Sequence, residues 1–440
     1  MSDHETAKAI ADRIHALNDS GKASLSLLLD TKWPELRTGD VSEKIQFRMG
    51  DVFRIYTHTG IVPEWAKFLT CDYVHLSEDV NIGSLIEIDS GLFHVRTIAK
   101  WNGFVEVEAE NDALIGSRRH VNLPGVRIRL PGITDKDKED ILFGIQNGYH
   151  FIAASFIRTA ENVREIRAFL DKNGGKDVRI ISKIENEEGV ENLEEIVKIS
   201  DGIMVARGDL GIEVPIEKVP KYQKKIIDLC RQHGKFVIVA THMLESMIEF
   251  PFPTRAEVSD IFRAVLQGAD ATMLSGETTT GKYPLHAVEM MNKVIIEAEE
   301  ELEHKHHPYS NDGLTQRDIE KKLLIRSALE VAEDMEIDTV ILFTKSGRLA
   351  RLAAAYRPNI EIHAFTESVE TMGLMRLLFG IVPHRMEMLW DQQIRLETAL
   401  QSLLDMENIT RDSRVIAITD RIITRREWQV IEIITVADVI

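Results

Sequence analysis

Residues 181–215 read ISKIENEEGVENLEEIVKISDGIMVARGDLGIEVP, and this stretch decides the fold. It contains two short apolar strands with an amphipathic helix between them. The first strand ends in Lys183 and Glu185, and the second leads into Asp209. A βα barrel builds its active site from such groups at the carboxyl ends of neighbouring parallel strands. The stretch therefore predicts one strand–helix–strand unit of a barrel, with functional side chains at its strand ends.

The charged residues at these strand ends have a chemistry of their own. Glu185 and Asp209 are hard oxygen ligands that suit Mg²⁺ or Mn²⁺. Lys183 lies two residues from Glu185, so the two side chains point to one face of the strand. A cation beside a metal held by two carboxylates suits reactions of a phosphate or an enolate. A lone Lys-x-Glu is more often a solvated ion pair, so the longer strings around it decide between the two interpretations.

Composition places the chain among globular proteins of more than one domain. It has 440 residues, 44% of them hydrophobic, and a formal net charge of -18. This acidic balance argues against nucleic acid as the main partner. The two cysteines, Cys71 and Cys230, lie far apart and fit a reducing compartment better than a disulfide framework. With no membrane-spanning apolar run and no signal peptide in view, we expect a cytoplasmic protein without a membrane partner.

A repeated strand–helix pattern extends on both sides of the opening stretch. After a first helix at 5–18, six apolar strands are predicted at 24–30, 151–157, 179–185, 202–207, 235–241 and 271–275. We therefore expect an α/β fold with a TIM (β/α)8-type barrel of which six strands are recognisable. Six strands cannot close a barrel, so the other two would precede residue 1. The chain then either begins at an internal methionine or is a shortened form.

Two further segments interrupt or follow this pattern. Residues 35–122 hold short, alternating, β-branched strands, which predict an inserted small all-β domain. The barrel then comprises residues 1–34 and 123–306. A polar linker leads to a C-terminal α/β domain of regulatory type at 317–440. Its predicted strands are 339–344, 360–366, 414–419 and 430–436.

Several strings, in one order and with regular spacing, resemble the pyruvate kinase family. They are VNLPGV (121–126), LPGITDKDKEDILFGI (130–145), SKIENEEGV (182–190), VARGDLG (205–211), THMLESM (241–247), PTRAEVSD (253–260) and MLSGET (273–278). The resemblance covers nearly the whole chain and is strongest from 122 to 284. It implies transfer of a phosphoryl group between phosphoenolpyruvate and ADP, giving pyruvate and ATP. It also implies Mg²⁺ or Mn²⁺, K⁺ and a homotetramer.

The resemblance assigns roles to the residues at the strand ends. Lys183 would neutralise charge on the phosphoryl group during transfer. Glu185 and Asp209 would hold the divalent metal against the substrate's oxygens. The backbone N–H groups of Gly208 and Asp209, which open a helix, would bind the substrate carboxylate. Thr241 would lie beside the enolate carbon and help to order its protonation.

Further matches concern the monovalent cation and the nucleotide. Asp30, Thr31 and Ser2 correspond to ligands of K⁺, and Arg37 corresponds to a contact with a nucleotide phosphate. Ser155, Ser275 and Glu277 match polar positions around the site. Trp33 departs from the family pattern, which has a glycine there, and an indole could narrow the nucleotide and cation site. The upstream arginine and asparagine of the family are absent from the sequence given, which would impair catalysis if the chain starts at Met1.

A second anion site is predicted in the C-terminal domain. The loop TKSGR consists of Thr344, Lys345, Ser346, Gly347 and Arg348, between a strand and a helix N-terminus. Allosteric pyruvate kinases bind an effector's phosphate on a matching loop, whereas a bare S-G-R is more often an ordinary capped turn. The region 419–429 lacks the family's glycines but carries Arg421, Arg425 and Arg426. We expect a phosphorylated metabolite, a sugar phosphate or nucleoside monophosphate rather than fructose 1,6-bisphosphate.

Two other functions remain open at the level of sequence. A metal-dependent lyase of the same barrel superfamily would also hold an enolate with a Glu and an Asp. Lys183, the inserted domain and the C-terminal domain argue against a lyase. A non-catalytic ligand-binding homologue is the third reading, and the retained Lys183, Glu185, Asp209 and Thr241 weigh against it.

Overall fold

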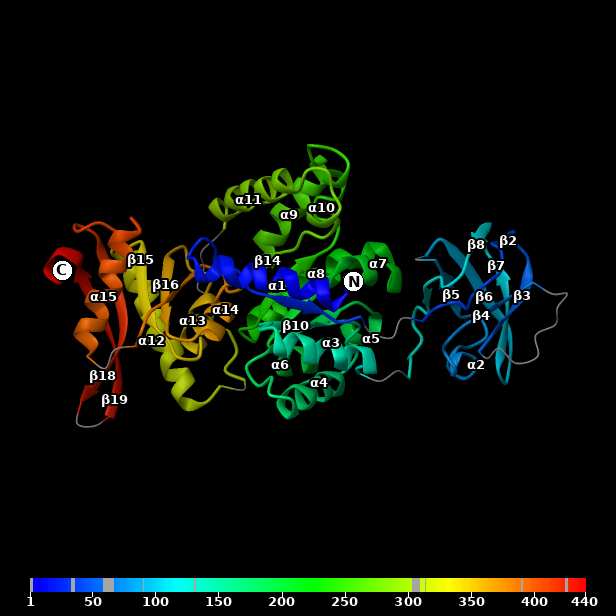
Figure 1. Cartoon of the computed structure of the whole chain (residues 1–440), viewed down its shortest axis with the longest axis horizontal. Coiled ribbons are helices and arrows are strands. Elements are labelled where there is room, and N and C mark those ends of the chain that lie inside the picture. The colour runs from blue at the N-terminus through cyan, green and yellow to red at the C-terminus, as the bar shows by residue number, and fades with distance from the viewer. Residues whose placement is uncertain are drawn as a thin grey trace.

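The computed structural model describes residues 3–32, 36–57, 67–89, 91–129, 132–302, 309–312, 314–388, 391–423 and 426–440. For residues 420–428 it describes no side chains. Three groups of elements follow one another along the long axis of the molecule (Figure 1). The β-rich segment lies at one end, the C-terminal α/β segment at the other, and the barrel strands lie between them.

The central sheet contains six parallel strands in chain order, β1-β10-β11-β12-β13-β14. Their bounds are β1 (Leu28–Asp30), β10 (Phe151–Ala154), β11 (Arg179–Ile184), β12 (Gly202–Ala206), β13 (Phe236–Ala240) and β14 (Ala271–Thr272). The register pairs Ile181 with Gly202 and Val205 with Val239, so the carboxyl ends of successive strands lie side by side. The predicted barrel class with six strands is confirmed, and the strands form a half-barrel.

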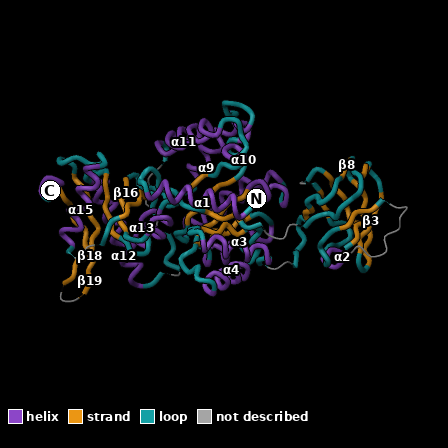
Figure 2. The backbone as a smooth tube through the Cα atoms, in the orientation of Figure 1, coloured by secondary structure: helices purple, strands orange, loops and turns teal. Residues whose placement is uncertain are grey.

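Helices cover the outer face of this sheet, as the tube drawing shows (Figure 2). Their bounds are α1 (His4–Asp19), α3 (Asp135–Gln146), α4 (Ala160–Lys172), α5 (Glu187–Glu191), α6 (Leu193–Ile199), α7 (Arg207–Glu213), α8 (Val219–Gln232), α9 (Arg255–Gln267), α10 (Gly276–Thr279) and α11 (Pro284–Glu300). Capping boxes begin α3 at Thr134 and α9 at Thr254. The single helix predicted between β11 and β12 is divided into α5 and α6 at Asn192, whose amide donates to the carbonyl of Arg158 at 2.9 Å.

The segment inserted after β1 is built of strands around an aromatic core. Its larger sheet has the order β4-β3-β7-β6-β5-β9, and β2 pairs separately with β8. The bounds are β2 (Ile45–Phe47), β3 (Val52–Tyr56), β4 (Phe68–Thr70), α2 (Leu76–Asp79), β5 (Leu85–Ile88), β6 (Phe93–Trp101), β7 (Phe104–Ala109), β8 (Ala113–Ile115) and β9 (Val121–Asn122). Phe47, Phe53 and Phe93 pack together and are buried. Strands β2, β4, β8 and β9 were not predicted, because each has only two or three residues.

The C-terminal segment contains a five-stranded sheet of order β17-β16-β15-β18-β19. Its elements are α12 (Gln316–Asp334), β15 (Thr339–Phe343), α13 (Arg348–Ala354), β16 (Glu361–Thr366), α14 (Val369–Met375), β17 (Ile381–Arg385), α15 (Gln392–Asp405), β18 (Arg414–Ile423) and β19 (Arg426–Thr435). The four predicted strands are present. Strand β17 was missed because it carries Pro383, which a sheet tolerates at an edge such as this one.

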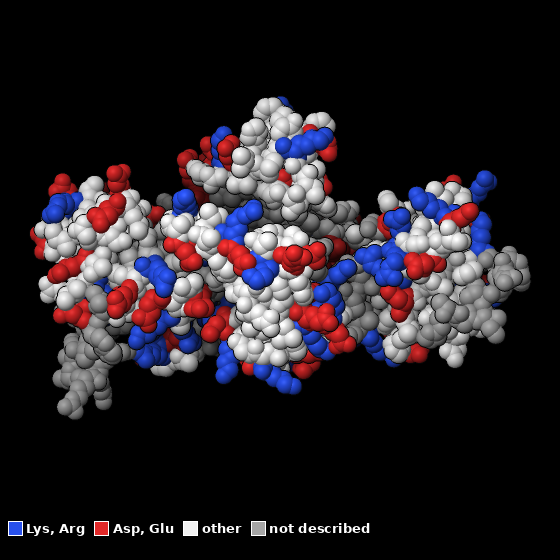
Figure 3. Space-filling view, viewed as in Figure 1, with Lys and Arg blue, Asp and Glu red and all other residues white. Residues whose placement is uncertain are grey.

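The C-terminal segment packs against the half-barrel through a shared apolar core. Phe151 and Phe236 of the barrel belong to one buried cluster with residues of α12 and α13. Arg357 and Asp270 form a buried ion pair of 2.7 Å across the same contact. Within the described part of the chain, no helix has the length and hydrophobicity needed to cross a bilayer. Basic and acidic side chains are interspersed on the face shown in Figure 3 rather than gathered in a basic stripe.

Candidate active site

Lys183 lies at the centre of a polar cluster at the carboxyl ends of β1, β10 and β11. Its ammonium nitrogen is 3.0 and 3.3 Å from the two carboxylate oxygens of Asp30. It donates to the hydroxyl of Ser155 at 2.9 Å and lies 3.0 Å from Oε1 of Glu185. The predicted convergence of Lys183, Glu185 and Asp30 on one strand edge is therefore present, and Ser155 joins it as expected from its matched position.

The charge state of Lys183 is set by these carboxylates. Burial alone would lower the pKa of Lys183, but the nearby charges of Glu185 and Asp30 outweigh it and raise the pKa above its usual value. Glu185 is 0% exposed, and burial raises its pKa to about 7. The neighbouring carboxylate of Asp209 adds to this rise, while the charge of Lys183 opposes it. The cluster thus holds a permanent cation beside two carboxylates that repel each other.

The surroundings of Glu185 fit a metal ion. Its Oε2 accepts a hydrogen bond of 2.5 Å from the backbone N–H of Phe156, a residue with φ of 50°. Its Oε1 is buried and accepts no hydrogen bond in the described structure, so its only contact there is the ion pair with Lys183. Asp209 follows on α7, and the two acids provide hard oxygen ligands. Within the described residues, no group of three or more His, Cys, Asp or Glu side chains is placed to hold a metal ion.

Thr241 lies on the other side of α7, after β13. The backbone N–H of Gly208 donates to its hydroxyl at 3.2 Å. A side chain at Gly208 would meet the Thr241 methyl carbon at 3.3 Å, so glycine permits this close approach. Thr241 and His242 have φ values of 69° and 55°, which are uncommon for residues other than glycine.

Two residues whose roles the sequence did not decide hold this turn in place. Arg207 donates to the carbonyls of Ala240 and Thr241, at 3.2 and 2.5 Å, and forms an ion pair with Asp260. Glu277 is buried and accepts backbone hydrogen bonds from Leu244 at 3.0 Å and from Ser275 at 2.7 Å. Arg207 and Glu277 both lie in strings already noted for their resemblance, but only the fold shows what they contact.

The residues expected to hold K⁺ are partly described. The side chain of Asp30 is 55% exposed, so it can accept a second cation besides Lys183. Thr31 is buried; its carbonyl accepts from Ser155 at 2.9 Å and its hydroxyl accepts from the Ser155 N–H at 3.1 Å. Ser2 and Trp33 lie outside the described residues.

Arg37 lies in the β-rich segment rather than on a barrel strand. Its backbone N–H donates to the carboxylate of Asp72 at 2.8 Å, and its guanidinium donates to the carbonyl of Arg118 at 2.8 Å. Arg37 and His120 form an isolated β-bridge where the chain enters and leaves this segment. The chain passes between the barrel and the β-rich segment twice, and we call these two connections the first and second crossing. The guanidinium of Arg37 takes part in holding the two crossings together.

The TKSGR loop joins β15 to α13, as expected. Lys345 and Ser346 are exposed, and Thr344 is buried with its N–H bonded to the carbonyl of Phe365. Gly347 has φ of 72°, which requires glycine at this turn. Arg348 forms an ion pair with Asp318 of α12. The side chains of Arg421, Arg425 and Arg426 lie outside the described residues.

Comparisons with family models match both large parts of the chain. Residues 1–288 match the family described as "Pyruvate kinase, barrel domain". Residues 322–433 match "Pyruvate kinase, alpha/beta domain".

Individual relatives agree with these matches. The pyruvate kinase of Lactococcus lactis is 41% identical over 87% of this chain and 77% of its own length. The pyruvate kinase of Eimeria tenella is 38% identical over 94% of this chain and 79% of its own length. Plastidial pyruvate kinase 2 of Arabidopsis thaliana is 38% identical over 94% of this chain and 71% of its own length. A crystal structure of a pyruvate kinase from Cryptosporidium parvum superposes with a TM-score of 0.91 at 32% identity, covering 99% of this chain and 89% of that one.

Proposed function

The chain belongs to the pyruvate kinase family, and we propose how its residues divide the work of transferring a phosphoryl group between phosphoenolpyruvate and ADP. The observation that carries the proposal is the position of Lys183, a buried cation in contact with Asp30, Ser155 and Glu185. Phosphoryl transfer needs positioning and charge neutralisation more than a covalent nucleophile. A fixed cation between two carboxylates supplies both.

Lys183 acts on the phosphoryl group while it moves between donor and acceptor. The neighbouring carboxylates keep its ammonium group protonated, so the group carries its charge at the start of each turnover. Its three contacts come from three different strands, which fixes the nitrogen without any rearrangement during the reaction.

Glu185 and Asp209 would hold Mg²⁺ or Mn²⁺, and Oε1 of Glu185, whose described polar contact is the ion pair with Lys183, is an oxygen available to the ion. When bound, the ion supplies positive charge to the substrate's oxygens. Asp30 and Thr31 are the described residues that would contribute to a K⁺ site, together with Ser2. Gly208 and Asp209 bind the substrate carboxylate through their backbone N–H groups; that of Gly208, which donates to the Thr241 hydroxyl at 3.2 Å, is then shared between the two acceptors.

Thr241 orders the protonation of the enolate that remains after the phosphoryl group leaves. Its hydroxyl oxygen accepts from the Gly208 N–H, which leaves the hydroxyl proton available for a bond to the substrate. Arg207 and Glu277 act through the turn that carries Thr241, and both are positioning residues. Arg37 contacts a nucleotide phosphate, as its match to the family position implies.

The remaining expectations belong to the same proposal. The barrel domain comprises residues 1–34 and 123–306, the inserted domain comprises 35–122, and the C-terminal domain comprises 317–440. Separate apolar cores in the β-rich segment and the barrel support this division. A phosphorylated effector binds at Thr344, Lys345, Ser346, Gly347 and Arg348, and the exposure of Lys345 and Ser346 supports it. The homotetramer and the cytoplasmic location stay predictions.

A coupled assay tests the function directly. We expect the chain to form ATP and pyruvate from phosphoenolpyruvate and ADP in the presence of Mg²⁺ and K⁺. A lyase would instead consume or release a second carbon compound without forming ATP. Absence of ATP formation by folded protein, with any of the tested metals, would favour a ligand-binding homologue.

A further inference from the structure

A cavity of about 140 Å³ lies where the chain passes between the barrel and the β-rich segment. One wall comes from the two crossings, at Leu36 and at residues 120–128. The other comes from barrel loops, at Phe156, Arg158 and residues 186–191, and from Glu213 of α7. An engineered cavity of about 150 Å³ in another protein binds benzene, so this one has room for an organic molecule of ring size.

Two polar residues lining the cavity have no partner for one of their side-chain atoms. Asn122 and Asn186 are only 3% and 7% exposed. In the described part of the chain, Oδ1 of Asn122 and Nδ2 of Asn186 make no hydrogen bond. A buried polar atom without a partner destabilises the fold. One acceptor and one donor are therefore available to a molecule in the cavity.

The charges around the cavity favour a cation. Four carboxylates line it, those of Glu187, Glu188, Glu191 and Glu213. Arg127 lies 3.7 Å from Glu191, and Arg158 donates to the carbonyl of Ile128 at 2.9 Å. Among the described residues Glu187 and Glu188 form no ion pair, and Glu213 accepts from Asn122 at 2.6 Å. After these contacts an excess of negative charge remains.

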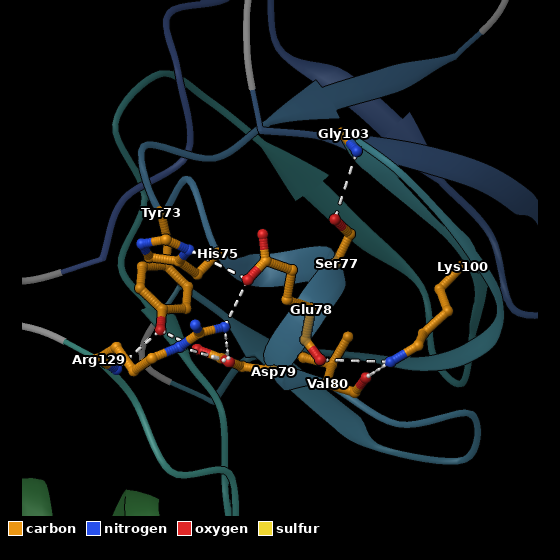
Figure 4. A network of polar contacts seen from close by, with 9 residues as sticks. All are labelled: Tyr73, His75, Ser77, Glu78, Asp79, Val80, Lys100, Gly103 and Arg129. Carbon is orange, nitrogen blue, oxygen red and sulfur yellow. Dashed lines mark hydrogen bonds and ion pairs between the residues drawn. The ribbon is translucent and has the colours of Figure 1, made fainter.

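The second crossing is tied to both segments at two adjacent residues, Ile128 and Arg129, which holds the cavity wall in place. On the β-rich side the guanidinium of Arg129 contacts Asp79 at 2.9 Å and Glu78 at 2.6 Å (Figure 4). The backbone N–H of Arg129 also donates to the Tyr73 hydroxyl at 2.8 Å (Figure 4). On the barrel side the guanidinium of Arg158 donates to the carbonyl of Ile128. A preformed site lets a ligand bind without first ordering the chain.

We propose that this cavity binds a small primary amine whose ammonium group meets Glu213 and Asn122 and whose apolar body contacts Leu36, Val121 and Val126. An ammonium group can satisfy the free oxygen of Asn122 and the carboxylate beside it together. A bare metal ion fits the cavity less well than an amine, because a small cation would leave most of the space, and its apolar walls, without contacts.

The occupied cavity is coupled to the metal site, and this step rests on the proposed function. Phe156 lines the cavity and its N–H holds Glu185. Glu213 lines it from the same seven-residue helix that carries Asp209. A ligand that shifts either element changes the distance between the two metal-binding carboxylates. By linkage, metal and amine then alter each other's affinity by the same factor.

The test uses 2-phenylethylamine, with 2-phenylethanol as the neutral probe of the same shape. Calorimetric titration of the full chain at pH 8 avoids the protonation of Glu213, whose pKa burial raises to about 7. We expect binding of the amine, and binding of the alcohol weaker by about tenfold or more. Equal binding of both probes, or no binding of the amine at about 10 mM, would overturn the proposal.

Variants locate the binding site and separate it from catalysis. Glu213→Gln should weaken the amine about tenfold and leave the alcohol unchanged, whereas Glu195→Gln, on an exposed turn of α6, should change neither. If Glu213→Gln does not fold, the amine affinity of Glu188→Gln is measured in its place. Unchanged amine affinity in the folded cavity variants would refute the site.

Amine binding needs no turnover, so a chain inactive toward phosphoenolpyruvate that still binds the amine would contradict the proposed function alone. An amine affinity that is the same with and without Mn²⁺ would refute the coupling.

Discussion

Replacing Lys183 with methionine tests the central element of the site. The side chain keeps its length but loses a charge that contacts Asp30, Ser155 and Glu185 within 3.3 Å. Glu185, which is fully buried, then keeps only the N–H of Phe156 as a described partner. The change should therefore affect both catalysis and stability, for separate physical reasons.

The expected sizes of the two effects follow from this geometry. Loss of one preorganised electrostatic group typically lowers kcat by about 10²–10³-fold. Burial already raises the pKa of Glu185 to about 7, so at lower pH the carboxyl takes up a proton and part of the cost is avoided. Well above that pH, leaving a buried charge without its partner costs about 3–5 kcal/mol. For a unit of the barrel's size this corresponds to a fall in Tm of about 6–20 °C. Asp30 contributes little to that penalty, because its side chain is more than half exposed.

A double variant separates the two effects. Lys183→Met with Glu185→Gln removes both charges, so Tm should return toward the wild-type value while activity stays lost. The assays are the coupled ATP assay and thermal unfolding of the full chain without metal. A folded Lys183→Met protein with kcat within about tenfold of wild type would refute the placement of the phosphoryl group. An unchanged Tm in the single variant would refute the ion-pair argument.

Three further predictions use other residues. Asp209→Asn removes one of two charged ligands and should raise the Mg²⁺ or Mn²⁺ midpoint of activity by about tenfold or more; an unchanged metal titration would place the ion elsewhere. Burial raises the pKa of Glu213 to about 7 in the fold, so wild-type stability falls as the pH rises from about 4.5 to 7, by about 3 kcal/mol at most. Glu213→Gln lacks this loss, and Tm values at pH 5 and 8 should show the variant gaining on wild type at pH 8; a constant difference would disprove it. Ser346→Asp places a negative charge on the TKSGR loop and should abolish activation by a phosphorylated metabolite without changing the metal requirement. Calorimetry with sugar phosphates and AMP measures binding of the effector to both proteins. Equal binding by the variant and the wild type would count against the site.

The barrel strands could be predicted because burial on both faces produces continuous apolar runs. β10, β12 and β13 are buried at every position, and their sequences show it. The convergence of Lys183 and Glu185 also followed from the two-residue period of a strand. These features depend only on local sequence and on the parallel order of the strands.

Other features depend on contacts between distant segments, which a local pattern does not contain. The hydrogen bond from the Phe156 N–H to Glu185 joins two strand ends 29 positions apart. The cavity needs several segments that lie far apart in the sequence, and Asn122 and Glu213 alone are 91 positions apart. β17 was hidden for a different reason: Pro383 marks it as a loop, although an edge strand accepts proline.

The turn at Thr241 shows why these distant contacts matter for the chemistry. A threonine held at φ of 69° costs on the order of 1–3 kcal/mol, because its β-branched side chain disfavours the left-handed region. Such a turn persists only when contacts with its surroundings stabilise it by more than the strained backbone costs. Arg207 bonds the Thr241 carbonyl, and Glu277 bonds the N–H of Leu244 three residues later. The turn held in this way places the Thr241 hydroxyl 3.2 Å from the backbone nitrogen of Gly208 on the neighbouring strand end.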